Sequence, residues 1–446
     1  MNSPELLTRR RSRLQAVYVV ALLGLIGFFN TADGVVLSVV LPKIKPEFQL
    51  SYSQVGLLSA AFTVALALGA IPIGIWADRS SRRLVIGLGV GVWSLFTLLT
   101  GFAQNFIQLF AARSVVGVGE ASYLPAGMAL LADHFGKQSR GRAVAAVATM
   151  AGLGIGGGLI IGGVVGQHFG WRAAFFLAGV PGLGLALLAL TMHEPLRGEA
   201  ESAGPKAVAS PETGLRSLLG LLRIRTFAAA VAAAALAQFG FAVISFLPLY
   251  LSQKFGLSLS QVGALVGAPQ LLAALVMGPL TGVLIDWRAR RTPRAAVEVG
   301  IGGLLLAAAG MLVMFSASSV AAYAAGEILF VFTAGVTVLA TPVILQNVIA
   351  PSLRASAGSI NLTISRLVGS ALSPIAIGVV SDLLHSNLGL SMLLLGPVAF
   401  VLAAGCLAMS SMQRDVEAME ASWSARQPVL SAETTVARTA IAVGRA

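Results

Sequence analysis

Charged side chains are scarce in this chain. Asp, Glu, Lys and Arg make up 11% of its 446 residues, against about 25% in ordinary soluble domains. Hydrophobic residues make up 57% of the chain. This balance excludes an ordinary water-soluble fold and indicates a protein that lies largely within a membrane.

Other scarcities exclude whole classes of function. The one cysteine, Cys406, cannot form an intramolecular disulfide. The chain has no G-x-x-x-x-G-K-[ST] phosphate loop, so we do not expect ATP to drive it directly. The histidines fall at scattered loop positions without metal-ligand spacing: His134, His168, His193 and His385. We therefore predict no metal site, no cofactor and no enzymatic activity.

Long apolar runs fill most of the sequence. The first extends from about Ala16 to Leu41, which is longer than the 7–15 apolar residues of a signal-peptide core. Eleven more follow, centred near Thr63, Gly91, Gly119, Gly156, Leu183, Gly240, Val276, Ala307, Phe332, Pro374 and Val401. The prediction is an all-α membrane protein of twelve transmembrane helices in two pseudo-symmetric six-helix halves.

The polar segments set the expected domain boundaries. We predict a cytosolic segment at 1–15, a six-helix bundle at 16–192, a cytosolic linker at 193–225, a second bundle at 226–411 and a disordered cytosolic tail at 412–446. Most of the 30 basic residues then fall in segments on one side. The positive-inside rule assigns that side, with both termini, to the cytosol. The net charge of +12 is explained without nucleic acid.

A loop motif occurs twice in register. Gly74, Asp78, Arg82 and Arg83 recur 208 positions later as Gly282, Asp286, Arg290 and Arg291. Both copies lie where an apolar run ends in a basic turn. The repeat indicates two homologous membrane halves, an organisation typical of transporters.

Taken with the twelve spans and the central linker, the duplicated loop resembles the major facilitator superfamily. Within it, the stretch from Arg113 to Tyr123 (RSVVGVGEASY) and Asn30-Thr-Ala-Asp33 resemble the Spinster-like branch. That branch usually has an arginine directly after the aspartate, where this chain has Gly34. The resemblance implies alternating access, a central cavity lined by spans one, four, seven and ten, and lipid-like substrates.

The resemblance also implies a gating role for the loop motif. A carboxylate beside a helix N-terminus is stabilised by about 0.3–1 kcal/mol, so Asp78 is expected to contact the start of span eleven, and Asp286 the start of span five. Alternatively, the basic residues only anchor the topology. The predicted gating residues are Gly74, Asp78, Arg79, Arg82, Arg83, Gly282, Asp286, Arg290 and Arg291.

Span five carries glycines at a spacing of four: Gly154, Gly158 and Gly162. This spacing predicts close helix packing. It also resembles the superfamily's antiporter-associated motif, with Leu159 in place of proline. An export function and close packing alone both remain open.

Ionisable residues inside the spans are the candidate chemistry, because such groups are costly in a bilayer and usually face a cavity. Asp33 and Arg113 are expected to pair. Glu120 lies two helical turns after Arg113 and is the candidate proton-coupling residue; the alternative is a static polar clasp between spans one and four. Asp382, at the outer end of span eleven, is expected to be solvated.

Two further charged residues are candidates for substrate contact. Glu327 matches Glu120 to within one position of the repeat offset, or simply meets water near the end of span ten. Arg366 binds an anionic headgroup or pairs with a neighbour. Uncharged substrate-binding candidates on the predicted cavity helices are Asn30, Tyr123, Gln238, Phe241 and Phe246.

The predicted function is proton-coupled secondary transport of an amphipathic or lipid-like organic anion, as an exporter or antiporter. The alternatives are proton symport of a small carboxylate and a non-transporting membrane sensor. The expected partners are a small-molecule substrate, membrane lipids and H⁺ as coupling ion. We expect a monomer in a bacterial inner membrane.

Overall fold

The computed structural model describes residues 3–195, 221–349 and 353–410. Most of the predicted linker, and the whole predicted tail at 412–446, lie outside these residues. Within them the chain is helical, without a strand, and twelve helical segments are long and apolar enough to cross a membrane. The predicted fold class is thereby confirmed.

The first half contains seven helices that make six spans, because the fourth span is divided between two of them. They are α1 (Ser3–Glu47), α2 (Tyr52–Arg79), α3 (Arg82–Gly101), α4 (Phe106–Glu120), α5 (Tyr123–His134), α6 (Lys137–His168) and α7 (Trp171–Leu190).

The second half also makes six spans, two of which are interrupted. Its elements are α9 (Arg225–Phe241), η2 (Ala242–Phe246), α10 (Leu247–Phe255), α11 (Leu259–Ala289), α12 (Ala295–Ser316), α13 (Val320–Val348), α14 (Arg354–Ile364), η4 (Ser365–Ala371), α15 (Leu372–Leu383) and α16 (Leu388–Ala408).

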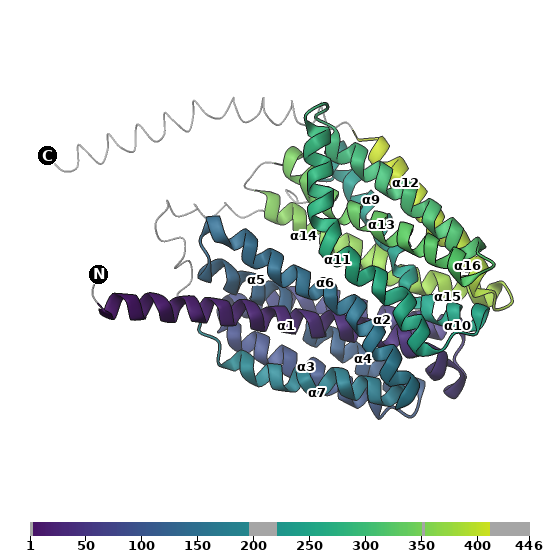
Figure 1. Cartoon of the computed structure of the whole chain (residues 1–446), viewed down its shortest axis with the longest axis horizontal. Coiled ribbons are helices and arrows are strands. Elements are labelled where there is room, and N and C mark those ends of the chain that lie inside the picture. Colours follow the sequence, from purple (N-terminus) through teal and green to yellow (C-terminus); the bar gives the residue numbers. More distant parts are fainter. Residues whose placement is uncertain (1–2, 196–220, 350–352, 411–446) are drawn as a thin grey trace.

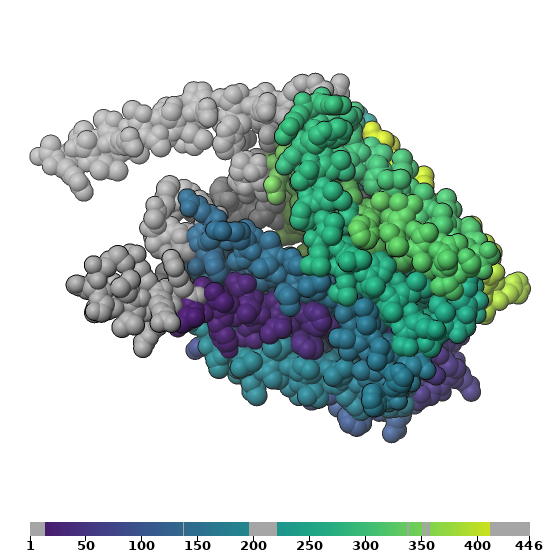
Figure 2. Space-filling view, in the orientation of Figure 1, coloured from purple at the N-terminus to yellow at the C-terminus, as the bar shows by residue number. Residues whose placement is uncertain are grey.

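The two halves form separate bundles that touch along a limited interface (Figure 1). The main contacts between them are α6 with α11 and α2 with α15. We call the end of the molecule that carries Arg82 and Arg290 the basic end. The end that carries the loops at 48–51 and 384–387 is the opposite end. Figure 2 shows the halves joined toward the opposite end and separated at the basic end.

Glycines permit the close approach of the two halves. Gly163 lies against the backbone of Leu259 and Gly263, and Gly156 lies against Gly267 and Leu271. A side chain at either glycine would collide with the other helix, so the interface depends on small residues. Another face of α6 carries the predicted glycines. Gly154, Gly158 and Gly162 pack against α1, which is the close packing that their spacing predicts.

Candidate functional site

The candidate site begins with a buried ion pair in the first half. The Arg113 guanidinium on α4 lies 3.1 Å from the Asp33 carboxylate on α1, and both side chains are at most 2% exposed. Thr97 on α3 donates a second hydrogen bond to Asp33, at 2.9 Å. The expected pair is confirmed. Because a buried charge left without its partner is costly, the pair holds three helices together.

Glu120 lies at the point where the fourth span breaks. It is the last residue of α4, and α5 begins three residues later. Its side chain is 5% exposed, and its Oε1 atom has no hydrogen-bond partner among the described residues. Breaks in membrane helices are tolerated where the backbone is buried in protein or lines a cavity. The break and the unpartnered oxygen together mark Glu120 as a site residue.

Charges from both halves act on Glu120. Asp33, Arg113 and the side-chain amide of Asn30 belong to its own half, whereas Arg366 belongs to the second half. Arg366 lies in η4, a seven-residue π-helical segment that interrupts span eleven. Irregular turns of this kind often occur at functional sites. The two side chains belong to different halves, and their opposite charges act on each other across the interface.

The other predicted substrate-contacting residues divide into two groups. Asn30, Gln238 and Phe241 are partly exposed, and the Gln238 amide donates to Ser370 Oγ at 3.4 Å. In contrast, Phe246 is fully buried in the hydrophobic core. The Tyr123 hydroxyl donates a hydrogen bond to the Leu23 carbonyl oxygen, at 2.9 Å. Both side chains pack against other helices in this conformation, and their place at the substrate site stays a prediction.

Glu327 also departs from its prediction. It is fully buried and accepts a hydrogen bond from Tyr323, one turn earlier on α13, at 3.0 Å. It therefore neither meets water nor lies open to a cavity in this conformation. The repeat offset suggested that Glu327 and Glu120 occupy equivalent sites, but their surroundings differ. Tyrosine and phenylalanine side chains pack around Tyr323, the hydrogen-bond partner of Glu327.

The duplicated loop motif lies at the basic end, and the close approach expected at its glycines is not made in this conformation. A Cβ atom added at Gly74 or Gly282 would have no other atom within 4 Å. Asp78, Arg79, Asp286, Arg290 and Arg291 are exposed. A closed basic end remains a prediction for another conformation.

The first copy of the motif is tied into its own half. Arg82 forms an ion pair with Asp133 at the end of α5, and Arg83 donates to the Met192 carbonyl oxygen at 3.4 Å. Glu194 accepts hydrogen bonds from the backbone N–H of Arg82 at 2.7 Å and from Ser81 Oγ at 2.5 Å. Burial alone would raise the pKa of Glu194, but these hydrogen bonds and the Arg82 charge hold it below its ordinary value.

A carboxylate does meet a helix N-terminus of the other half, but at the opposite end. Asp382 at the end of α15 accepts hydrogen bonds from the backbone N–H groups of Tyr52 and Ser53, at 3.0 and 2.8 Å, and from Ser53 Oγ at 2.5 Å. Asp382 was expected to be solvated and it is exposed, in agreement with the prediction, but its contacts with the other half were not predicted. The first free N–H groups of a helix attract a carboxylate.

The second contact between halves repeats the arrangement with a neutral group. Gln167 at the end of α6 accepts a hydrogen bond from the backbone N–H of Leu259, the first residue of α11, at 3.1 Å. We call Asp382 with Tyr52 and Ser53, together with Gln167 and Leu259, the latch. Sequence analysis missed the latch. The signal was available in Ser51-x-x-Gln54 and Ser258-x-x-Gln261, capping boxes that mark both helix starts.

The twelve spans, the two packed halves and the buried charges between them define a multi-pass membrane transporter. The sequence profile of the Major Facilitator Superfamily matches residues 23–374. The chain belongs to this superfamily, in its Spinster-like branch. The superfamily consists of transporters and not of enzymes.

Individual relatives agree with this assignment. Protein spinster homolog 1 of Xenopus laevis is 30% identical over 399 residues, which cover 82% of this chain and 73% of that protein. An MFS-type efflux pump of Mycolicibacterium smegmatis is 29% identical over 91% of this chain and 96% of its own length. Among solved structures, a bacterial homolog of human Spinster in an inward-facing, unoccupied conformation superposes with a TM-score of 0.75 and 26% identity, covering 89% of this chain and 96% of that one.

Proposed function

We propose that this protein is a proton-coupled transporter of an amphipathic organic anion, with Glu120 as the residue that gains and loses the proton. The observation that carries the proposal is that positive charges from both halves act on the buried Glu120. Arg113 is fixed in the same half by Asp33, whereas Arg366 belongs to the other half. When the halves move relative to each other, only the second interaction changes.

This geometry supplies a physical route from proton to movement. A buried carboxylate is stable in its charged form only near a compensating cation. Separation of Arg366 from Glu120 therefore favours proton uptake, and their approach favours proton release. Arg366 also provides a positive group for the headgroup of an anionic substrate, which would compete with Glu120 for the same guanidinium.

The direction and side of transport are part of the proposal. The positive-inside rule supports a basic end that faces the cytosol, with both termini there, so the present conformation is open to the cytosol. The similarity to an efflux pump supports export. The similarity to a sphingosine-1-phosphate transporter of Xenopus tropicalis, 28% identical over 80% of this chain, supports a lipid-like anion.

Symport of a small carboxylate is the second candidate. It is favoured by one relative, a probable L-galactonate transporter of Escherichia coli that is 28% identical over 91% of this chain and of its own length. Both candidates use Glu120 and Arg366 in the same way. They differ in the substrate and in the direction of the proton relative to it.

Transport into proteoliposomes tests the proposal and separates the two candidates. Purified protein is assayed with labelled sphingosine-1-phosphate and with labelled L-galactonate, under proton gradients of either sign. We expect gradient-driven accumulation of one substrate, lost in Glu120→Gln, with exchange at equal concentrations retained. Accumulation by Glu120→Gln at the wild-type level would refute the role of Glu120.

A further inference from the structure

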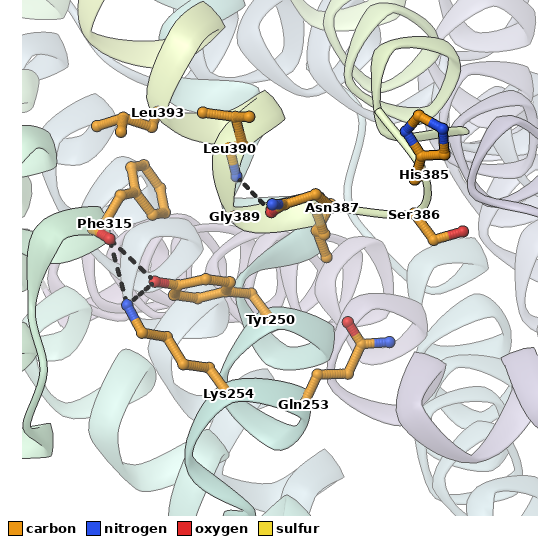
Figure 3. Close-up of a pocket in the computed structure, with 11 residues that line it drawn as sticks. Tyr250, Gln253, Lys254, Phe315, His385, Ser386, Asn387, Gly389, Leu390 and Leu393 are labelled. Atoms are coloured by element: carbon orange, nitrogen blue, oxygen red, sulfur yellow. Dashed lines mark hydrogen bonds between the residues drawn. The ribbon is translucent and has the colours of Figure 1, made fainter. Parts of the chain in front are cut away.

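A cavity lies at the opposite end of the second half, away from Glu120 and Arg366. It has a volume of about 590 Å³ and is bounded by the end of α10, the end of α12 and the turn between α15 and α16. Figure 3 shows its lining, with Lys254, Tyr250 and Phe315 on one side and Asn387 and Gln253 on the other. Neither Glu120 nor Arg366 lines this cavity.

A fixed positive charge lies in this cavity. Lys254 Nζ donates hydrogen bonds to the Tyr250 hydroxyl at 2.8 Å and to the Phe315 carbonyl oxygen at 3.2 Å. The ammonium also lies within 5.4 Å of the ring centres of Tyr250 and Phe255. An ammonium has three N–H donors, so one donor remains for a ligand while the other two hold the group in place.

The amide side chains of the lining present donors rather than acceptors. The Gln253 carbonyl oxygen already accepts a hydrogen bond from the Tyr52 hydroxyl at 3.0 Å, and that of Asn387 accepts from the Leu390 backbone N–H at 3.0 Å. The NH₂ groups of both amides are left for a ligand. Among the described residues that line the cavity none is acidic. The polar part of the cavity is therefore suited to an oxyanion.

The rest of the lining is apolar. Phe315 and the leucines at 388, 390 and 393 supply this surface. The polar turn beside it includes His385 and Ser386, which have φ angles of 55° and 66°. Residues other than glycine rarely adopt this left-handed backbone conformation, and those that do cluster at ligand sites. A cationic end next to an apolar wall matches a molecule with one anionic group and one apolar part.

We propose that this cavity binds the phosphate or carboxylate headgroup of an amphipathic molecule, and that it does so independently of the candidate site around Glu120. Lys254 and the amides of Gln253 and Asn387 hold the oxyanion, and the apolar part lies against Phe315 and Leu393. Gln253 also accepts a hydrogen bond from the hydroxyl of Tyr52, whose backbone N–H belongs to the latch, so Tyr52 connects the cavity to the latch.

Calorimetric titration of the full-length protein in detergent tests the proposal. Three probes are compared: dihexanoyl phosphatidic acid, dihexanoyl phosphatidylcholine and inorganic phosphate. We expect saturable binding of phosphatidic acid that weakens at least tenfold in Lys254→Gln. Weaker binding of phosphatidylcholine is expected because its choline cation approaches Lys254. Binding of free phosphate as tightly as phosphatidic acid would overturn the role of the apolar wall.

Matched variants separate this cavity from other sites. Lys43→Gln removes an exposed lysine of α1 that lies outside the cavity lining and is expected to leave binding unchanged. Glu120→Gln should also leave it unchanged, even if transport is lost, so the two proposals fail separately. If Lys254→Gln does not fold, Gln253→Leu, which replaces an exposed side chain of the lining, takes its place. Unaltered affinity in the folded cavity variants would overturn the proposal.

Discussion

The two ends of the interface between the halves differ in a way that their sequences conceal. At the basic end the duplicated motif suggests a gate, yet Gly74 and Gly282 approach no neighbour. At the opposite end the repeated capping boxes do not by themselves suggest a gate, yet Gly56 lies against the backbone of Pro374 and Gly378 lies against that of Tyr52. A repeated motif therefore identifies where contacts are needed in some conformation, and not where they exist in a given one.

The same physical device serves the opposite end. A side chain from each half accepts hydrogen bonds from the first N–H groups of a helix in the other half: Asp382 for α2 and Gln167 for α11. The predicted Asp78 contact is the same device at the basic end. We propose that alternating access exchanges one set of capped helix ends for the other.

Crowding of the opposite end should have the largest effect on the equilibrium between the two conformations. Gly378→Leu places a side chain against the Tyr52 backbone, and overpacking of this kind costs about 1–3 kcal/mol. We expect the opposite end to open, measured as a longer spin-label distance between the halves there. Gly74→Leu should leave that distance unchanged and instead prevent closure at the basic end.

Both variants should stop transport, but in opposite conformations. Gly405→Leu on α16, where an added Cβ meets no atom within 4 Å, is the matched control and should transport normally. If Gly378→Leu and Gly74→Leu favour the same conformation, the difference between the two ends is refuted.

Removal of the charge from the latch should have the next largest effect. In Asp382→Asn, the carboxylate that accepts three hydrogen bonds is replaced by a neutral amide. Hydrogen bonds to charged groups contribute about 1.5–3 kcal/mol each. Because Asp382 is exposed, we expect a shift of roughly tenfold toward the conformation that is open at the opposite end, about 1.4 kcal/mol in total. Gln167→Leu removes a single neutral bond and should shift the equilibrium less. The reverse order would contradict the account of the latch.

A smaller effect is expected at the basic end. Asp78→Asn replaces a carboxylate that we predict to face the N-terminus of span eleven when this end closes. The charge contributes about 0.3–1 kcal/mol to that interaction. Labelling of cysteines introduced at the basic end, in a Cys406→Ser background, should therefore increase a few-fold. Unchanged labelling would favour the alternative that the motif only anchors the topology.

The smallest effect concerns pH and Glu194. Hydrogen bonds from Ser81 and Arg82 hold its folded-state pKa below the ordinary value of 4.5. Its stabilising contribution is therefore present at neutral pH and is lost as the pH falls below 4.5 and through the lower folded-state pKa. Glu194→Gln should melt at a lower temperature than wild type at pH 7, and the gap should close as the pH falls. A gap that is constant with pH would contradict this assignment.

Some of the site could be predicted from the sequence alone. Asp33 and Arg113 are charged residues within long apolar runs, so each needed a partner, and their heights along spans one and four allowed only a few choices. The glycines of span five required a closely packed neighbouring helix, because small residues at a spacing of four let another backbone approach. Local pattern and the bilayer together determine such features.

Other features depended on tertiary packing that no local pattern records. Phe246 and Tyr123 lie in spans that the family resemblance predicts to line a cavity, but Phe246 is buried in the core and the Tyr123 hydroxyl donates to Leu23 on α1. The contacts of the exposed Asp382 could not be predicted, because its partners, Tyr52 and Ser53, are some 330 positions away. The π-helical turn at Arg366 has no signature in hydrophobic periodicity.

The central claim is that protonation of Glu120 controls the separation of the two halves. It is tested most directly by the spin-label distance between Gln138→Cys on α6 and Ala289→Cys on α11, both exposed at the basic end, measured against pH. In wild type we predict a pH-dependent change in the populations of the two conformations, and in Glu120→Gln a distribution independent of pH. The same pH response in both proteins would contradict the claim.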